Sequence, residues 1–218
     1  LSSSSAASDV YKRQATFPAV PSGECVASNK VLDLTGKTNT DGRLVWNIPP
    51  GDWTILRCGR TSTGQTTRPA PTPGLGFEAD KFDRAATDAH FDHFVGELLK
   101  TVGEPKHADR GLTTLHFDSW EMGSQNWSEH FRAEFTQRRG YDPLRFLPAM
   151  TGRVVDNPET SERFLWDLRL TAQELTVGNH VARLKELGRN HGMDFSLEPY
   201  DLNPVSYTHL TLPTKRIV

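Results

Sequence analysis

Apolar residues spaced three and four apart predict a helix between residues 83 and 102. They recur at i, i+3, i+4, i+7, i+8 and i+11, and they are Phe91, Phe94, Val95, Leu98, Leu99 and Val102. Asp83 stands just before this run, where an Asp side chain can accept a hydrogen bond from a backbone N–H of the first turn. We therefore expect one amphipathic helix, capped by Asp83, with this face on the protein core.

Two more helical stretches follow in the chain. One is expected to run from Ser128, as N-cap, to about Arg139, with Gly140 as the left-handed residue that ends it. The other opens at Asn157-Pro158, because Asn caps well and Pro suits a first turn. Its apolar face comprises Leu165, Leu168, Ala172, Leu175, Val181, Leu184 and Leu187. A helix of roughly 33 residues is long for a globular protein, so a bend near Gly178 is expected.

Two segments between the helices are predicted to be strands, Leu112–Asp118 and Met193–Glu198. In the second, apolar and polar residues alternate, as in a strand with one face on a core. Strands separated by helices indicate βα units and a parallel sheet. The predicted fold class is therefore α/β, a partial (β/α)8 TIM-type barrel with its active site at the carboxyl ends of the strands. A doubly wound open sheet would also bind ligands there, but no glycine-rich phosphate loop favours it.

The N-terminal third has a different character, rich in Pro, Gly and Thr. Residues 43–48 and 53–58 are β-prone, and Pro49-Pro50-Gly51-Asp52 between them has the composition of a turn. The sequence therefore predicts a hairpin, the end of a small β-sandwich domain that precedes the barrel.

The predicted domain organisation has four parts. Residues 15–76 form the β-rich remnant and linker, and residues 77–204 form the N-terminal part of the barrel. Residues 1–14 and 205–218 resemble translated sequencing-adaptor read-through and are expected to be non-native. The chain is thus interpreted as an internal piece of a longer bacterial, metagenome-derived protein, which we expect to act in the periplasm or outside the cell.

Composition excludes several classes of function. The net charge is -2, and no basic excess indicates a nucleic-acid partner. No apolar run reaches the roughly 18 residues of a membrane span. The two cysteines, Cys25 and Cys58, lack metal-ligand spacing and are expected to be unpaired thiols rather than a disulfide.

The segment His116–Trp127 carries the densest candidate chemistry. Indole faces stack on sugar rings, while carboxylates and amides bind their hydroxyls. Glu121 lies beside Trp120, and burial against an indole can raise a carboxyl pKa as a general acid requires. The predicted substrate-binding residues of this segment are His116, Asp118, Trp120, Gln125 and Asn126. The alternative, equally weighted from the motif alone, is that its tryptophans belong to the core and Glu121 caps the next segment.

Other candidate site residues lie elsewhere in the chain. Glu198, at the end of the second strand, is predicted to be a catalytic or site-lining carboxylate. The alternative for Glu198 is a buried ion pair. Tyr200 could bind a sugar hydroxyl. In the segment Phe77–Lys81, Asp80 and Lys81 could contact substrate, although an ordinary salt bridge is favoured there. Histidines on the predicted helices are interpreted as surface residues rather than metal ligands: His90, His93, His130 and His180.

Five motifs in order along residues 40–204 resemble glycoside hydrolase family 106. They are Gly76–Lys81, His116–Trp127, Arg138–Pro143, Ser161–Asp167 and Leu197–Tyr200. The resemblance implies an inverting α-L-rhamnosidase with a (β/α)8 barrel and bound calcium, acting on oligo- or polysaccharides. It also implies that Glu121 is the strand-end catalytic glutamate, that Glu198 lines the active site, and that further catalytic glutamates would lie beyond Pro204.

Two other functions remain open at this point. A retaining β-galactosidase-like glycosidase would use Glu121 as acid/base and Glu198 as nucleophile, with the carboxyl groups about 5–5.5 Å apart instead of about 6.5–9.5 Å. A non-catalytic carbohydrate-binding module would be nearly all β, whereas residues 83–192 predict mostly helix.

Overall fold

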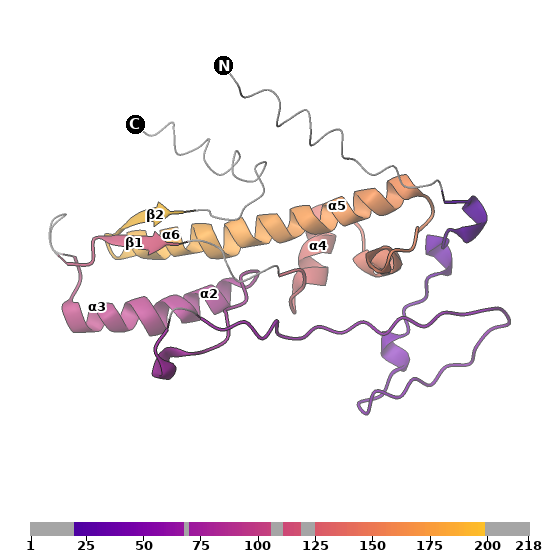
Figure 1. Cartoon of the computed structure of the whole chain (residues 1–218), viewed down its shortest axis with the longest axis horizontal. Helices are drawn as coiled ribbons and strands as arrows, with labels where there is room; N and C mark the ends of the chain where they lie inside the picture. The colour runs from indigo at the N-terminus through magenta and orange to yellow at the C-terminus, as the bar shows by residue number, and fades with distance from the viewer. Residues whose placement is uncertain (1–19, 68–69, 106–110, 119–124, 199–218) are drawn as a thin grey trace, which may run out of the picture. The chain divides into compact units, whose positions relative to one another are not determined.

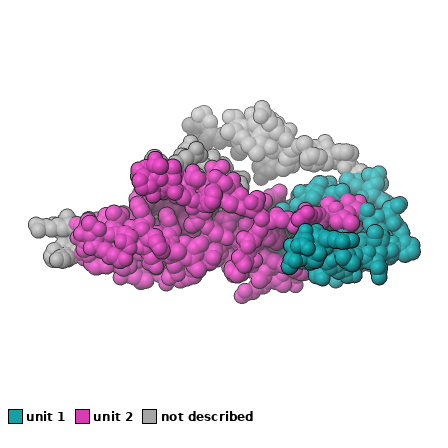
Figure 2. Space-filling model, turned by 90° about the horizontal axis from the view of Figure 1, so that it is seen from below, with its two compact units in different colours: residues 1–53, 143–165 teal, residues 54–142, 166–218 magenta. Residues whose placement is uncertain are grey.

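The structure is a computed structural model that describes residues 20–67, 70–105, 111–118 and 125–198. These residues divide into two compact units (Figure 2). Unit 1 comprises residues 1–53 and 143–165, and unit 2 comprises residues 54–142 and 166–218. None of the helices in the described ranges is long and apolar enough to cross a membrane. The predicted domain boundaries, the non-native ends included, remain predictions.

The sheet of unit 2 consists of two parallel strands, β1 (Thr114–Phe117) and β2 (Asp194–Leu197). Thr114 pairs with Asp194 and Phe117 pairs with Leu197, so the strands are in register along their whole length. The predicted strands and their parallel pairing are confirmed. A complete TIM barrel is a larger structure than this two-stranded sheet.

Helices pack against one face of this sheet (Figure 1). They are α2 (Arg84–Phe91), α3 (Glu97–Val102) and α6 (Ala182–Asn190), with a π-helical segment, Asp92–Gly96, joining α2 to α3. The shared core comprises Phe91, Val95, Leu99, Leu184 and Met193, with Leu115, Phe117 and Phe195 of the strands packed on it. The apolar side chains of both strands therefore face the helices, as the alternation in Met193–Glu198 predicts for the second strand.

Two further α-helices of the described residues are α4 (Phe131–Arg139) and α5 (Pro158–Leu175). Gly140 ends α4 with a φ of 80°, as predicted, but His130 rather than Ser128 precedes its first residue. At the start of α5 the side chain of Asn157 accepts a hydrogen bond from the N–H of Thr160 at 2.8 Å. A second π-helical segment, Thr176–Val181, stands where a bend near Gly178 is predicted and joins α5 to α6.

The sequence predicts a wider buried face on the helix between residues 83 and 102 than the structure shows. Phe91, Val95 and Leu99 are buried, whereas Phe94, Leu98 and Val102 are 60%, 40% and 58% exposed. A face made of i, i+3 and i+4 positions covers about 100° or more of the helix. The two-stranded sheet and α6 cover only the part that carries Phe91, Val95 and Leu99.

The predicted β hairpin of residues 43–58 is wrong. The structure has no strand between residues 45 and 65, and Ile48, Trp53 and Ile55 are exposed. An antiparallel bridge instead joins Thr38 to Leu44. Isolated two-stranded hairpins are at best marginally stable in water without a further sheet or helix to cover them. Elsewhere in unit 1, short 3-10 turns dominate, and Phe146 packs on Phe164 with ring centroids 5.6 Å apart.

The N-cap of α2 offers a direct test of the predicted helix start. The Asp83 side chain accepts a hydrogen bond from the N–H of Ala85 at 2.9 Å. Asp83→Ala should therefore lower the free energy of unfolding by about 1 kcal/mol, whereas Asp83→Asn, which keeps the acceptor, should change it by only a few tenths. Urea unfolding followed by circular dichroism measures both. An equal loss in the two variants would show that the carboxylate acts through its charge.

Candidate functional site

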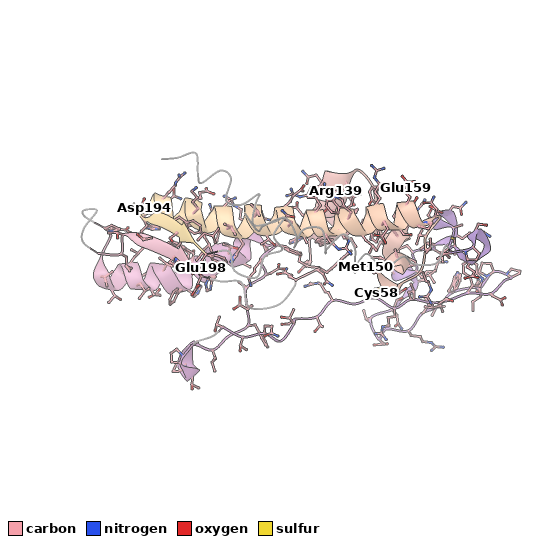
Figure 3. The ribbon with its side chains drawn as sticks, turned by 45° about the horizontal axis from the view of Figure 1, so that its top comes forward. Cys58, Arg139, Met150, Glu159, Asp194 and Glu198 are labelled. Atoms are coloured by element: carbon pink, nitrogen blue, oxygen red, sulfur yellow. The ribbon has the colours of Figure 1, made fainter. Side chains whose placement is uncertain are left out.

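The carboxyl ends of β1 and β2 bring two acidic side chains to the same edge of the sheet. Asp118 follows β1 and Glu198 follows β2, and the N–H of Glu198 donates to the carbonyl of Phe117 at 3.0 Å. In-register parallel strands end side by side, so the two carboxylates are neighbours. Figure 3 shows Asp194 and Glu198 at opposite ends of β2, which places Glu198 at the end where active sites form in barrels.

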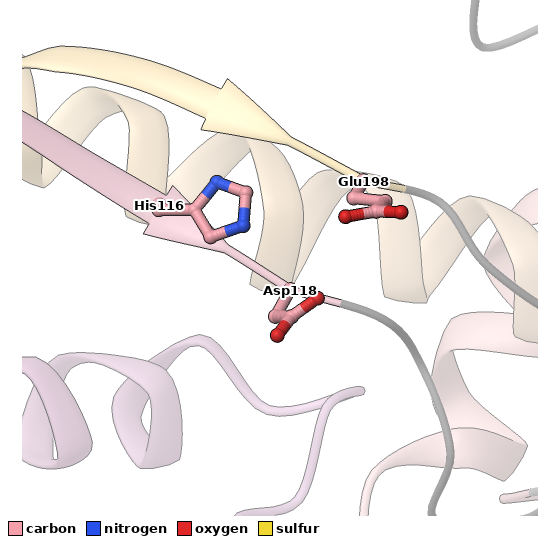
Figure 4. Close-up of side chains that lie close together, drawn as sticks. All are labelled: His116, Asp118 and Glu198. Carbon is pink, nitrogen blue, oxygen red and sulfur yellow. The ribbon is translucent and has the colours of Figure 1, made fainter.

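His116 joins these two acids on the polar face of the sheet (Figure 4). One ligand atom from each of His116, Asp118 and Glu198 lies within 4.8 Å of the others, and all three residues are exposed. The Nδ1 of His116 lies 3.2 Å from the Oγ of Ser196 on β2, so the ring orientation is fixed across the strands. Glu198 is exposed in this chain, and its predicted role at a site stays a prediction.

The side chains of Gln125 and Asp80 form a hydrogen bond with one another. The amide of Gln125 donates through Nε2 to Oδ1 of Asp80, and its Oε1 accepts from the N–H of Lys81 at 3.1 Å. Asp80 Oδ1 also accepts from the N–H of Phe82 at 2.9 Å. The amide thus joins Gln125 to the residues just before α2. This contact is typical of a positioning role for Gln125.

Lys81 forms the salt bridge that the sequence favours. Its Nζ lies 2.7 Å from Oε2 of Glu78, and the Lys81 side chain is only 9% exposed. Asn126, by contrast, is exposed. Trp120, Glu121 and Tyr200 lie outside the described residues, so their predicted roles stay predictions.

His180 is a feature that sequence reasoning placed wrongly. It is only 5% exposed, whereas a surface position is predicted for it. Its ring meets Phe117 of β1 edge-on with centroids 5.3 Å apart, and its Nδ1 lies 3.2 Å from Oγ1 of Thr87. Burial lowers the pKa of His180 to about 4, with the charge of Lys81 as the next cause. The spacing along the helix could have predicted this burial. His180 precedes the buried Leu184 by four residues, so the two side chains lie on the same helical face.

The donor set at the strand ends partly fits the calcium ion that the family resemblance implies. Calcium takes six to eight oxygen ligands. Asp118 and Glu198 supply such oxygens, whereas the imidazole of His116 is a ligand typical of zinc, copper, iron or nickel. Among the residues with defined positions, Asp118 and Glu198 are therefore the candidates to hold calcium, with further oxygens needed from other groups.

The two cysteines do not contribute to this site. Both Cys25 and Cys58 are free thiols, as predicted from their number and spacing. Neither lies near the strand ends in sequence, and neither belongs to the one three-residue cluster of possible metal ligands in the described ranges.

Comparison with known proteins assigns the chain to a family. The sequence profile of Glyco_hydro_106, alpha-L-rhamnosidase, matches residues 3–210. This range extends into both terminal segments. A protein of Formosa agariphila, named "Putative beta-glucuronidase", is 38% identical over 184 residues, which make up 83% of this chain and 15% of that protein. The solved structure of a rhamnosidase from Novosphingobium sp. PP1Y matches with a TM-score of 0.67 and 30% identity, covering 79% of this chain and 17% of that one.

The chain thus spans about one sixth of the length of these relatives. The solved relative is a rhamnosidase, and both relatives bear the names of glycosidases. The match to the family profile covers far more than half of the chain. The chain belongs to glycoside hydrolase family 106, the α-L-rhamnosidase family.

Proposed function

We propose that the protein hydrolyses terminal α-L-rhamnosidic bonds of plant or bacterial polysaccharides with inversion of configuration. The observation that supports this most directly is the match of residues 3–210 to the alpha-L-rhamnosidase family, and Asp118 and Glu198 bring two carboxylates to the strand-end edge where such a site would form. Glycoside hydrolysis requires carboxyl groups on both sides of the scissile bond. A rhamnose-containing glycan is then the substrate partner, and no feature of the chain favours a nucleic acid.

In this mechanism Glu121 protonates the leaving oxygen while a water molecule attacks the anomeric carbon. A base removes a proton from that water, and inversion needs room for it between the two carboxyl groups. Asp118, Glu198 and His116 line the sugar site, with Trp120 stacking on the ring and with Asn126 and Tyr200 binding hydroxyls. The hydrogen bond between Gln125 and Asp80 positions Gln125 beside the residues that precede α2. Calcium, if bound by Asp118 and Glu198, would orient sugar hydroxyls.

We further propose that unit 2 is part of a (β/α)8 barrel in the family's full-length proteins. Two observations support it: a parallel sheet of only two described strands, and a second apolar stripe on α2–α3. That stripe consists of Phe94, Leu98 and Val102, all exposed. Parallel sheets occur almost only where further strands and helices cover them. We also propose that such a full-length protein acts in the periplasm or outside the cell, where polysaccharides are encountered.

A second candidate is a retaining β-glycosidase. The name of the Formosa agariphila relative, a β-glucuronidase, is the observation that favours it. Here Glu121 would act as acid/base and Glu198 as nucleophile, and the product would keep the configuration of the substrate.

A chimera separates the two candidates. Residues 77–198 of this chain would replace the matching segment of the Novosphingobium rhamnosidase. We expect the chimera to hydrolyse 4-nitrophenyl α-L-rhamnoside and to release β-L-rhamnose first, as followed by proton NMR before mutarotation. A first-formed α-anomer would support retention. Turnover of a β-glucuronide without any turnover of the rhamnoside would contradict the proposed function.

The 218-residue chain alone should not hydrolyse the rhamnoside. A whole barrel typically takes about 250 residues, and the described sheet has only two strands. Loss of a catalytic carboxylate alone removes acid–base assistance worth about 10²–10⁴-fold. We expect kcat/KM at least about 10²-fold below that of the chimera, in the same assay with calcium present. Comparable turnover by the chain would show that both catalytic carboxyl groups lie within it.

A further inference from the structure

We propose that a groove on unit 1 binds a sugar unit that carries a carboxylate, such as a uronic acid. This groove is built from residues 36–39 and 45–47 and is distinct from the carboxylates at the strand ends. It has a volume of about 560 Å³ and is a shallow groove, largely open to solvent.

A short hairpin-like turn holds the two walls of the groove together. The N–H of Val45 donates to the carbonyl of Lys37 at 3.0 Å, and the N–H of Asn39 donates to the carbonyl of Arg43 at 3.0 Å. The Asn39 side chain closes the turn by accepting from the N–H of Arg43 at 2.7 Å. The walls are thus fixed by backbone hydrogen bonds, so the groove exists before any ligand arrives.

Trp46 supplies an aromatic surface in this groove. It is half-buried and lines the groove, and the ring of Trp53 meets it at 85° with centroids 5.2 Å apart. Trp53 is itself held, because its Nε1 donates to the carbonyl of Pro49 at 3.0 Å. An indole braced in this way can stack on the apolar face of a pyranose without first losing rotamer freedom.

The polar side chains of the groove determine which sugar suits it. Asn47 is exposed and offers its amide to sugar hydroxyls, as do the Nδ2 of Asn39 and the oxygen of Thr38, whereas Oδ1 of Asn39 and the hydroxyl hydrogen of Thr38 are used within the turn. Lys37 is the one charged residue among the lining residues, which include no carboxylate, and it forms no ion pair with any residue whose position is described. A cation without a lining anion favours a negatively charged ligand, and a charge-assisted hydrogen bond is about twice as strong as a neutral one.

The test uses the full 218-residue chain and two probes, methyl β-D-glucuronide and methyl α-L-rhamnoside. Saturation-transfer NMR should detect the glucuronide at millimolar concentration, and competition titrations should give it an affinity about tenfold above that of the rhamnoside. Trp46→Ala should weaken glucuronide binding by at least about tenfold. Lys37→Met should weaken it by a similar factor and leave rhamnoside binding unchanged. Trp166→Ala is the matched control, because Trp166 is a 63% exposed tryptophan on α5 outside the groove.

Glucuronide binding by Trp46→Ala equal to that of the wild type would overturn the proposal, as would equal affinity for the two probes. If circular dichroism shows that Trp46→Ala unfolds, Asn47→Ala serves in its place, since that side chain is exposed. Unchanged binding by Asn47→Ala would likewise count against the groove. The chimera contains only residues 77–198 of this chain, so its failure to hydrolyse rhamnosides would be a separate result.

Discussion

Glu121→Gln should lower the kcat of the chimera on natural rhamnosides by about 10²–10⁴-fold, with little change in KM. Gln keeps the size and hydrogen-bonding capacity of the side chain but cannot give a proton to the leaving oxygen. General acid assistance is worth a factor of this size. Because the interaction is made only in the transition state, the loss falls on kcat rather than on ground-state binding.

The chemistry of the leaving group distinguishes an acid from a residue that merely supports the fold. A 2,4-dinitrophenolate leaves without protonation, so the variant should lose far less activity on the dinitrophenyl rhamnoside than on a rhamnosyl alcohol. Glu129→Gln is the control, because Glu129 lies in the same part of the chain with a 70% exposed side chain paired to Arg60. An equal loss on both substrates would assign Glu121 a structural role and move the acid to another residue.

Local signals in the sequence predicted the elements that local interactions make. Asp83 caps α2 and Asn157 caps α5, because each side chain reaches a backbone N–H two or three residues away. The pairing of β1 with β2 was also predictable, since alternation in Met193–Glu198 fixes which face meets the core. That pairing in turn explains why Asp118 and Glu198 come together at one edge.

The errors arise where a structure depends on residues distant in the chain. The segments around Pro49–Asp52 have strand composition, but strands need partners, and the described residues provide only the Thr38–Leu44 bridge nearby. Helical periodicity likewise cannot tell that Phe91 will be covered and Phe94 left exposed. The contact of Gln125 with Asp80 could not be predicted for the same reason, because the two residues lie 45 positions apart in the chain.

Lowering the pH from 7 to 5 should destabilise the chain by about 2 kcal/mol through His180 alone. The pKa of this histidine is lowered from 6.5 to about 4 by burial, with the charges of Lys81 and His90 as further causes. Between these two values the unfolded chain binds a proton that the folded chain does not, so stability rises with pH and is lost as the pH falls from 6.5 toward 4. Below about 4 both states are protonated, and the full loss approaches about 3 kcal/mol.

Thr87 is a hydrogen-bonding partner of the His180 ring. Its Oγ1 lies 3.2 Å from Nδ1 of His180 and 3.3 Å from the carbonyl oxygen of Asp83, and the tautomer of the ring decides whether Thr87 donates or accepts in the first of these contacts. Protonation of the ring puts a hydrogen on both of its nitrogens. It would place a positive charge in a core region beside Lys81, whose side chain is itself mostly buried. The carboxylate of Glu78, bound to Lys81 at 2.7 Å, only partly offsets that repulsion.

Urea unfolding of the 218-residue chain at pH 7, 6 and 5 measures this linkage. His180→Asn, which keeps a donor for Thr87 but does not titrate, should be less stable than the wild type at pH 7 and should show a much flatter pH dependence. His130→Gln is the control for the removal of a histidine, because His130 is exposed before α4. Arginine partners lower the pKa of several aspartates and glutamates, Asp88 and Glu186 among them. Protonation of these groups lowers the stability of the folded chain at lower pH in every variant. The contribution of His180 is therefore the difference between wild type and His180→Asn in the slope of unfolding free energy against pH. Equal slopes would show that this imidazole is already protonated in the folded chain at pH 5.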